Sequence, residues 1–304
     1  MATSRTSIVR GPGTVSYAGS AIFDADGIDA EIESSVSEIP SSISGSIASI
    51  KTDQVGRISF TPCGQLSAAL LSLLYPYANP TVGASACGTA DRALTVHSLA
   101  GVKVTFPNAV LSKMPELRLS PVKTAFGAVE FAAAVALAKS PETAGSLYSV
   151  ETAVYSSGAP DPDGITGAAY AGTFGDLAIA DTLDGWTVTP EITLEPVAVD
   201  SIGTIDWTVG AVSCTATCTP VGLSESQILA ALPINKARGS ILGGDDLVIS
   251  GAGGLKVTLK NASLVRGPLR WGTTDLRAGQ IQFTAHRTFT GGTPGPVFSV
   301  ELAS

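Results

Sequence analysis

The chain has 304 residues, of which only 14% are charged, and a formal net charge of −8. General affinity for nucleic acid depends on basic groups that displace counterions from phosphates, so an acidic chain with 18 Lys and Arg residues is not expected to bind nucleic acid generally. With two His residues, no His-based catalytic or metal site is expected, and the sequence predicts no enzyme, no cofactor and no metal.

Two segments show the alternation of a half-buried strand. In 28–33 and again in 187–195, one face is apolar and the other is polar. The carboxylates on the polar faces are Asp29, Glu31, Glu33, Glu191 and Glu195. The ordinary interpretation of such a row is a solvated outer face.

The segment 34–53 follows the first of these strands and is rich in Ser and Ile. It is interpreted as a flexible connection between two strands, and its counterpart in the second half is placed near 196–206. A polar segment of about 20 residues in a compact domain is usually functional.

One helix is expected in each half. Residues 65–74 carry apolar side chains at helical spacing. In the second half, Ser224-Glu-Ser-Gln227 has the capping-box pattern, in which the Ser hydroxyl accepts from the third residue's amide while Gln reaches back. This pattern predicts a helix over 227–232.

Further strands are predicted at 102–106 and 255–259, where apolar and polar residues alternate. Residues 127–133 have a helical composition. Their counterpart, 280–284, alternates plainly, so both are predicted to be strands.

The sequence contains an internal duplication. Residues 101–111 match 254–264, with seven of eleven positions identical, and other matches keep the same order at spacings of 152 to 158 positions. The predicted organisation is therefore a first domain at 1–155, a linker rich in Pro, Gly and Asp at 156–166, and a second domain at 167–304. Each copy is predicted to be a mainly β sandwich or barrel with one flanking helix.

The remaining motifs have ordinary interpretations. Cys63, Cys87, Cys214 and Cys218 lack disulfide or metal spacing and are expected to be buried thiols. The glycine-rich 250–256 lacks the phosphate-loop ending and is predicted to be a hairpin turn. No stretch has the length of a membrane span, and the N-terminus lacks a signal-peptide core, so synthesis in a cytoplasm is expected.

A low fraction of charged residues combined with a mean hydropathy of +0.32 indicates a large buried surface. Obligate assemblies have large apolar interfaces and therefore need less surface charge on each chain. The composition thus favours an obligate oligomer.

The first half resembles the tail tube proteins (major tail proteins) of long-tailed, non-contractile bacteriophages. The resemblance covers about residues 10–135. The segments that carry it are 11–15, 57–65, 77–79, 94–106, 113–117 and 123–131. The second half lacks the opening motif and most of the central run, so its membership depends on the internal match.

The resemblance implies a ring of six tube domains whose inner strands join into one ring-wide barrel. Rings stack into a hollow tube through which phage DNA passes. Two domains per chain then imply a homotrimer with pseudo-hexameric symmetry, and no catalytic residues come with the family. The implied location is the virion tail after assembly in the host cytoplasm. The implied partners are further copies and the distal or baseplate, terminator and tape-measure proteins, with no membrane.

Two site hypotheses follow from this resemblance. DNA must slide through the tube, and an acidic wall repels phosphates, so Asp29, Glu31, Glu33, Glu191 and Glu195 are the candidates for lumen-facing residues. The segment 34–53 is expected to reach the next ring. Its candidate stacking residues are Ser41, Ser42, Ile43, Ser44 and Ile47.

Several alternatives stay open at this point. The same architecture suits a tube ring of a contractile particle or secretion system, or a tail terminator. A binding module such as an adhesin belongs to another class, although aromatic residues are only 6% of the chain and the three Trp residues are scattered. A ring of six chains would instead need twelve domains in the ring or one domain projecting outward.

Overall fold

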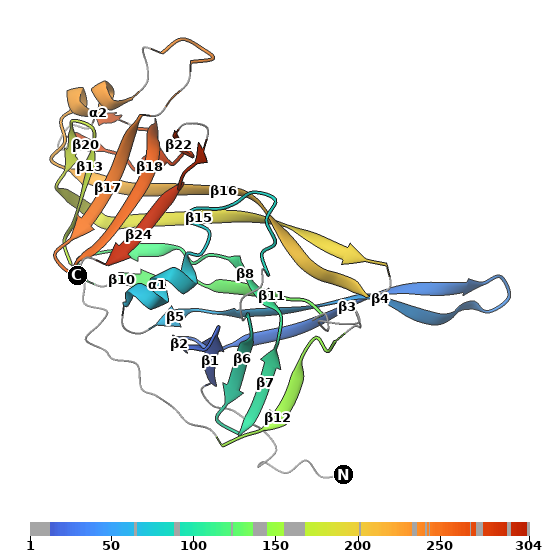
Figure 1. Cartoon of the computed structure of the whole chain (residues 1–304). Coiled ribbons are helices and arrows are strands. Elements are labelled where there is room, and N and C mark those ends of the chain that lie inside the picture. Colours follow the sequence, from blue (N-terminus) through green and yellow to red (C-terminus); the bar gives the residue numbers. More distant parts are fainter. Residues whose placement is uncertain are drawn as a thin grey trace.

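The computed structural model describes most of the chain, and its fold is mainly β, as the sequence predicts, with 63% strand and two short helices (Figure 1). The described residues are 13–63, 66–87, 92–122, 124–135, 145–154, 168–200, 202–232, 236–240, 242, 244–267, 269–271, 276–290 and 293–302. The predicted linker, 156–166, lies outside them, so the domain boundaries stay predictions.

The first half is a sandwich of two antiparallel sheets. One has the order β12-β7-β6-β1-β2-β5 and the other β3-β4-β11-β8. The bounds are β1 Gly13–Tyr17, β2 Ser20–Asp24, β3 Asp29–Ser41, β4 Gly45–Phe60, β5 Pro62–Cys63, α1 Ala68–Leu74, β6 Leu94–Ser98, β7 Val102–Phe106, β8 Ala109–Lys113, β9 Leu117–Leu119, β10 Thr124–Phe126, β11 Val129–Ala133 and β12 Ser149–Thr152.

An aromatic cluster fills the space between these two sheets. Phe131 on β11 is fully buried, with its ring centroid 4.7 Å from that of Tyr17 on β1 and 5.9 Å from that of Phe60 on β4. Tyr17 and Phe131 come from different sheets, so this contact joins the two layers.

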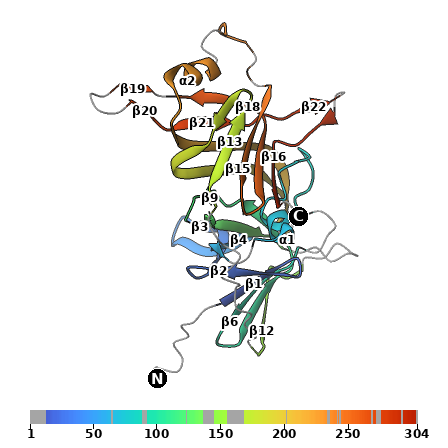
Figure 2. The ribbon, with the colours of Figure 1, turned by 90° about the vertical axis from the view of Figure 1, so that its left-hand side faces the viewer.

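A ten-stranded sheet contains β9 and β10 of the first half together with strands of the second half. Its order is β10-β9-β15-β16-β21-β18-β17-β13-β14, with β24 also paired to β18. The bounds are β13 Tyr170–Phe174, β14 Leu177–Ile179, β15 Asp181–Val199, β16 Gly203–Val221, α2 Glu225–Ala231, β17 Asp245–Gly251, β18 Leu255–Arg266, β19 Leu269–Trp271, β20 Leu276–Ala278, β21 Ile281–Thr284, β22 Phe289–Thr290, β23 Thr293–Pro294 and β24 Phe298–Leu302. The pairs β19-β20 and β22-β23 form separate two-stranded sheets (Figure 2).

The two halves have the same strand pairings in the same register. In the first half, Phe131 stands opposite Ile58 on β4 and Leu111 on β8. In the second, Phe283 stands opposite Ala216 on β16 and Leu264 on β18. These are the residues that the sequence match aligns, so strand β3 corresponds to β15, β4 to β16, β11 to β21, and β7 with β8 to β18.

One residue explains why the layers are separate in the first half and continuous in the second. Pro107 ends β7, because proline has no N–H for the ladder. The equivalent residue is Lys260, whose N–H donates to the carbonyl of Val297 at 2.9 Å. Strand β18 therefore runs on through both layers.

The helix predictions are confirmed, with shifted starts. Helix α1 begins at Ala68 after Ser67, whose hydroxyl accepts from the amide of Leu70. Ser224 and Gln227 form the predicted capping box, and α2 begins at Glu225, two residues earlier than predicted, because the capping Ser directly precedes the first helical residue. The strands predicted at 102–106, 127–133, 255–259 and 280–284 are also confirmed.

The prediction that 34–53 is a flexible connection is wrong. Strand β3 runs through to Ser41 and β4 begins at Gly45, so only 42–44 form the turn of a long hairpin. The segment near 196–206 is likewise the end of the β15–β16 hairpin. The many Ser residues concealed a run of Ile and Val that favours strand. The described residues form no closed barrel.

We predict that Phe131→Ala lowers the free energy of unfolding by about 3–5 kcal/mol, because the cavity would lie between the two sheets of the first half. Urea unfolding measures this change. Phe289→Ala is the control, since Phe289 is 68% exposed and its removal should change stability by less than about 0.5 kcal/mol. Equal effects of the two substitutions would contradict the packing described.

Candidate assembly surface

Two long hairpins dominate the surface of the molecule. Both β3–β4 and β15–β16 run toward the same side, and the tip of β3–β4 extends furthest from the body (Figure 1). They occupy equivalent positions in the two halves. Their surroundings differ, because β15–β16 packs against the first half whereas every residue of β3 from Asp29 to Pro40 is exposed.

The three predicted carboxylates of β3, Asp29, Glu31 and Glu33, all lie on the surface. Arg57 on β4 stands opposite Glu31 and forms a 3.5 Å ion pair with Glu33. Both partners are more than half exposed, so this pair contributes little to stability. It does offset part of the negative charge of the row.

Glu191 and Glu195 on β15 are also exposed. Glu191 is the counterpart of Glu33 in the register of the hairpins. A bulge interrupts the pairing with β16 after Ile192, and a bulge changes which face successive residues of the bulged strand occupy. The extra residue lies on β16, because Ile192 stands opposite Val212 and Leu194 opposite Val209, so the alternation of exposed and half-buried residues predicted for β15 extends from Glu191 to Glu195.

The predicted stacking residues lie at the tip of the β3–β4 hairpin. The Ser41 hydroxyl accepts from the amides of Ile43 and Ser44, both at 3.3 Å, and Gly45 has the positive φ of 75° that closes the turn. The side chain of Ile43 is 94% exposed and that of Ile47 is 60% exposed. Ser42 directly precedes Ile43 in the turn and is also exposed. The structure thus presents apolar side chains on an extended, hydrogen-bonded support.

A groove of about 620 Å³ separates the β3–β4 hairpin from β15 and β16. Its lining residues include Glu33, Asp53, Arg57, Leu194 and Trp207. The Glu33–Arg57 pair of the first half therefore faces the second hairpin of the same chain.

The two halves are joined edge to edge. Strand β9 of the first half pairs antiparallel with β15 of the second, with Leu117 opposite Val188 and Leu119 opposite Trp186. These four side chains are buried. The β9–β10 hairpin of the first half thus joins the sheet of the second half through backbone hydrogen bonds and an apolar inner surface.

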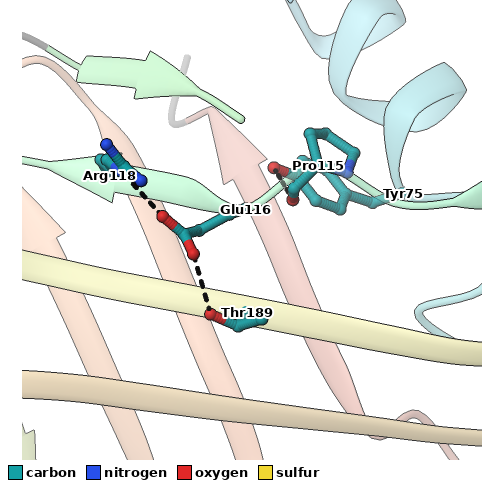
Figure 3. Close-up of polar contacts among 5 residues, drawn as sticks. All are labelled: Tyr75, Pro115, Glu116, Arg118 and Thr189. Atoms are coloured by element: carbon teal, nitrogen blue, oxygen red, sulfur yellow. Dashed lines mark hydrogen bonds and ion pairs between the residues drawn. The ribbon is translucent and has the colours of Figure 1, made fainter. Parts of the chain in front are cut away.

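The other face of this junction is polar. Glu116 accepts from Arg118 Nε at 2.6 Å and from the hydroxyl of Thr189 on β15 at 3.5 Å (Figure 3). The hydroxyl of Tyr75 donates to the carbonyl of Pro115 at 3.2 Å, which fixes the segment before β9 against the end of α1. Sequence reasoning did not find this junction, because no local pattern tells which strand edges meet.

A glycine allows the close approach of β9 to β15. Gly185 has φ of 81°, and a Cβ there would lie 2.0 Å from the carbonyl oxygen of Leu119. No other residue fits both the backbone conformation and the space.

A second contact joins the tip of β15–β16 to the first half. Asp53 on β4 accepts from the amide of Thr204 at 2.8 Å and from its hydroxyl at 2.7 Å. The segment 83–86 also pairs with β16, since Gly83 donates to Val209 and Ala86 donates to Trp207, both at 2.7 Å.

Two carboxylates of this contact have lowered pKa values. Burial alone would raise the pKa of Asp53, but the hydrogen bonds from Thr204 and Gln54 outweigh burial and lower it. Asp206 follows the same pattern, because hydrogen bonds that include the amide of Cys87 outweigh its burial. Both groups are therefore held as carboxylates between the halves.

The chemistry of the other candidate groups is limited. Cys87, Cys214 and Cys218 are buried free thiols, and burial raises the pKa of each. Cys63 is a half-buried free thiol. Among the described residues, no group of three or more His, Cys, Asp or Glu is arranged to hold a metal ion. No helix in the described part of the chain is long and apolar enough to cross a membrane.

Comparison with known protein families finds no matching family model, and comparison with curated proteins finds no matching sequence.

We predict that Asp53→Ala lowers the free energy of unfolding by about 1 kcal/mol at pH 7, because Thr204 loses two hydrogen bonds to a partly exposed carboxylate. The folded pKa is depressed, so this contribution is present above the unfolded value and is lost as pH falls through the folded pKa. The difference between the variant and the parent should therefore shrink below about pH 4.

Chemical unfolding at pH 7 and at pH 3 measures both effects. Glu38→Ala is the matched control, because Glu38 is an exposed carboxylate on the neighbouring strand. A difference for Asp53→Ala that persists undiminished at pH 3 would contradict the assigned role of the carboxylate.

Proposed function

We propose that this chain is a structural virion protein that forms stacked homotrimeric, pseudo-hexameric rings, the hollow tail tube of a long-tailed bacteriophage. One observation carries the proposal: two halves with equivalent strand registers join edge to edge within a single chain. A chain built of two repeated units that are joined to each other can use the equivalent surfaces, left free at its two ends, to join further copies in the same way. The resemblance of the first half to tail tube proteins supplies the biological setting.

The sheets support a tubular arrangement. Strands β3-β4-β11-β8 form one sheet and β15-β16-β21-β18 belong to another, and β9 connects them because it follows β8 in the chain and pairs with β15. In the proposed ring these eight strands of each chain lie side by side. Three chains would supply 24 strands. At ordinary strand spacing and barrel tilt, such a ring has a backbone diameter of about 45 Å. This width suits passage of a DNA duplex with its hydration.

In this arrangement the polar face of the inner strands forms the wall of the channel. Asp29, Glu31, Glu33, Glu191 and Glu195 are the proposed lumen residues, and their charge keeps phosphates from adhering. The wall needs no catalytic group, cofactor or metal, because its task is to let DNA pass. The tube is assembled in the host cytoplasm and ends against baseplate, terminator and tape-measure proteins.

The tip of β3–β4 is the proposed contact between stacked rings. Its exposed Ile43 and Ile47 offer apolar surface beyond the body of the chain. In the second half the corresponding tip also retains exposed residues, Val199 and Asp200, although its stem contacts the first half. Each chain would therefore present two tips to the neighbouring ring.

Electron microscopy of the concentrated protein tests this function, with a shortened hairpin as the matched variant. In that variant Asn-Gly replaces residues 40–47, which joins the paired residues Ile39 and Ala48 by a two-residue turn. The parent should form tubes of threefold rings with six lobes, whereas the variant should form single rings.

Single particles without rings from the parent, in the presence of a tail-initiating complex, would contradict the proposal and favour an adhesin-type module. Sixfold rings with outer knobs would contradict the trimer. Rings that never stack would favour a terminator. Normal tubes from the shortened variant would show that the hairpin tip is not needed for stacking.

We predict that reversing Glu31 and Glu191 to Lys slows DNA ejection at least several-fold while tubes still form, because a basic wall would bind phosphates. Timed release of DNA from purified virions measures the rate. Asp176→Lys is the control, since Asp176 lies in the exposed turn between β13 and β14. An unchanged ejection rate would show that Glu31 and Glu191 do not line the lumen.

A further inference from the structure

The junction within the chain leaves one strand edge and one hairpin unused. The edge of β15 is covered by the β9–β10 hairpin. The equivalent edge, the outer edge of β3, pairs with no strand among the described residues. An exposed strand edge of 13 residues invites pairing with another chain, and native proteins cover or block such edges.

The second half contains the counterpart of the hairpin that covers β15. Leu269-Arg270-Trp271 on β19 corresponds to Leu117-Arg118-Leu119 on β9. The registers agree, since Arg118 stands opposite Ala125 and Arg270 stands opposite Arg277. In the described part of the chain, β19–β20 pairs with no third strand. The hairpin and the unpaired edge are thus equivalent to two surfaces that already fit each other.

The glycines of the two hairpins also indicate that the first hairpin lacks a partner. Gly185 and Gly203 have positive φ, and a Cβ on either would meet atoms of the first half within 2.3 Å. Their counterparts, Gly27 and Gly45, have the same sign of φ but nothing within 4 Å. The first hairpin therefore keeps the backbone conformation of a covered hairpin and lacks the cover.

Burial shows the same contrast. Trp186 and Val188 are each 1% exposed beneath β9, whereas Ala30, the counterpart of Val188, is exposed. Besides Ile43 and Ile47 at the tip, four further apolar side chains of the β3–β4 hairpin are open to solvent, namely Ile32, Val36, Ile39 and Ile50. A monomer would gain nothing from this strip, which indicates that a further chain covers it.

We propose that the occupant is a second copy of this chain, whose β19–β20 hairpin adds to the outer edge of β3. The inference deepens the ring proposed above, because it names the surfaces through which the ring closes. The internal junction gives the register: Trp271 of one copy opposite Ile28 of the next, Arg270 opposite Asp29, and Leu269 opposite Ala30. The contact is head to tail, and with a rotation of one third of a turn per copy its repetition closes the trimeric ring proposed above.

The charges suit this register. Within the chain, Arg118 stands opposite Thr187. Between chains, the basic Arg270 stands opposite the acidic Asp29, and opposite charges directly across strands are stabilising. Asp29 stands where the second half has Thr187. The junction between chains would therefore contain a pair of opposite charges that the junction within one chain lacks.

The two surfaces lie at opposite ends of the row of inner strands. Strand β3 is the first strand of the row, residues 263–266 of β18 are its last part, and β19 follows directly on them in the chain. Figure 2 shows β19 and β20 projecting outward from the upper part of the molecule, with β3 in the lower part. A head-to-tail contact between different copies therefore uses both surfaces.

A pair of introduced cysteines tests the register. Residues opposite each other in antiparallel strands have Cα atoms about 4.5–5.5 Å apart, within the range of a disulfide. The variant D29C/R270C should give covalent oligomers under mild oxidation, with a ladder that ends at three chains. The matched control, R118C/T187C, should form its disulfide within one chain and give no ladder.

Single variants D29C and R270C control for reaction with the native thiols, of which three are buried. Tubes or rings without cross-linked chains in D29C/R270C would overturn the inference while leaving the tube in place. A three-chain ladder without tubes would support the inference and count against the tube.

Exchange of the two charges tests the partner contact independently. D29R and R270D should each reduce assembly at least tenfold, whereas D29R/R270D should restore it. Circular dichroism of each variant shows whether the chain is folded. Folded single variants that assemble like the parent, or a double variant that fails while folded, would overturn the pairing.

Discussion

The structure depends on the need of each strand edge for a hydrogen-bonding partner. Backbone N–H and C=O groups at an edge stay unpaired unless another strand, a barrel closure or a charged barrier covers them. In this chain, β9 covers β15, and the apolar residues beneath the junction, Trp186 and Val188, are buried as a result. The same need is unmet at β3, and the assembly inferred here follows from that difference.

Duplication gives this constraint its predictive value. The junction between the two halves of one chain is the model for the proposed junction between chains, which would use the same register and equivalent glycines. Sequence differences between the two copies can then be assigned structural effects. Lys260 in place of Pro107 merges two layers, and Asp29 in place of Thr187 adds charge at the edge that faces a partner.

Sequence reasoning recovered what local patterns determine. Alternation located β21, and the internal match extended that prediction to β11, whose own composition is helical. The capping box located α2, and the match of 101–111 to 254–264 identified residues that the structure places in equivalent registers. It failed at 34–53, where Ser content suggested flexibility and tertiary pairing imposed a hairpin. It also missed the β9–β15 junction, since pairing between distant strands leaves no periodic signal. The acidic residues of β15 lie on the surface with the alternation that the sequence predicts, whereas the extra residue of β16 opposite Ile192 and Leu194 depends on strand pairing and leaves no sequence signal.

Hydrogen exchange of the β3 backbone, compared between free and assembled chains, tests the central claim most directly. Unpaired edge amides exchange freely, whereas a strand added to that edge protects them. We expect fast exchange at the outer amides of 28–30 in the free chain and strong protection after assembly, with the equivalent amides of 186–188 on β15 protected in both states. Fast exchange at β3 in assembled particles would contradict the claim that this edge is where one copy joins the next.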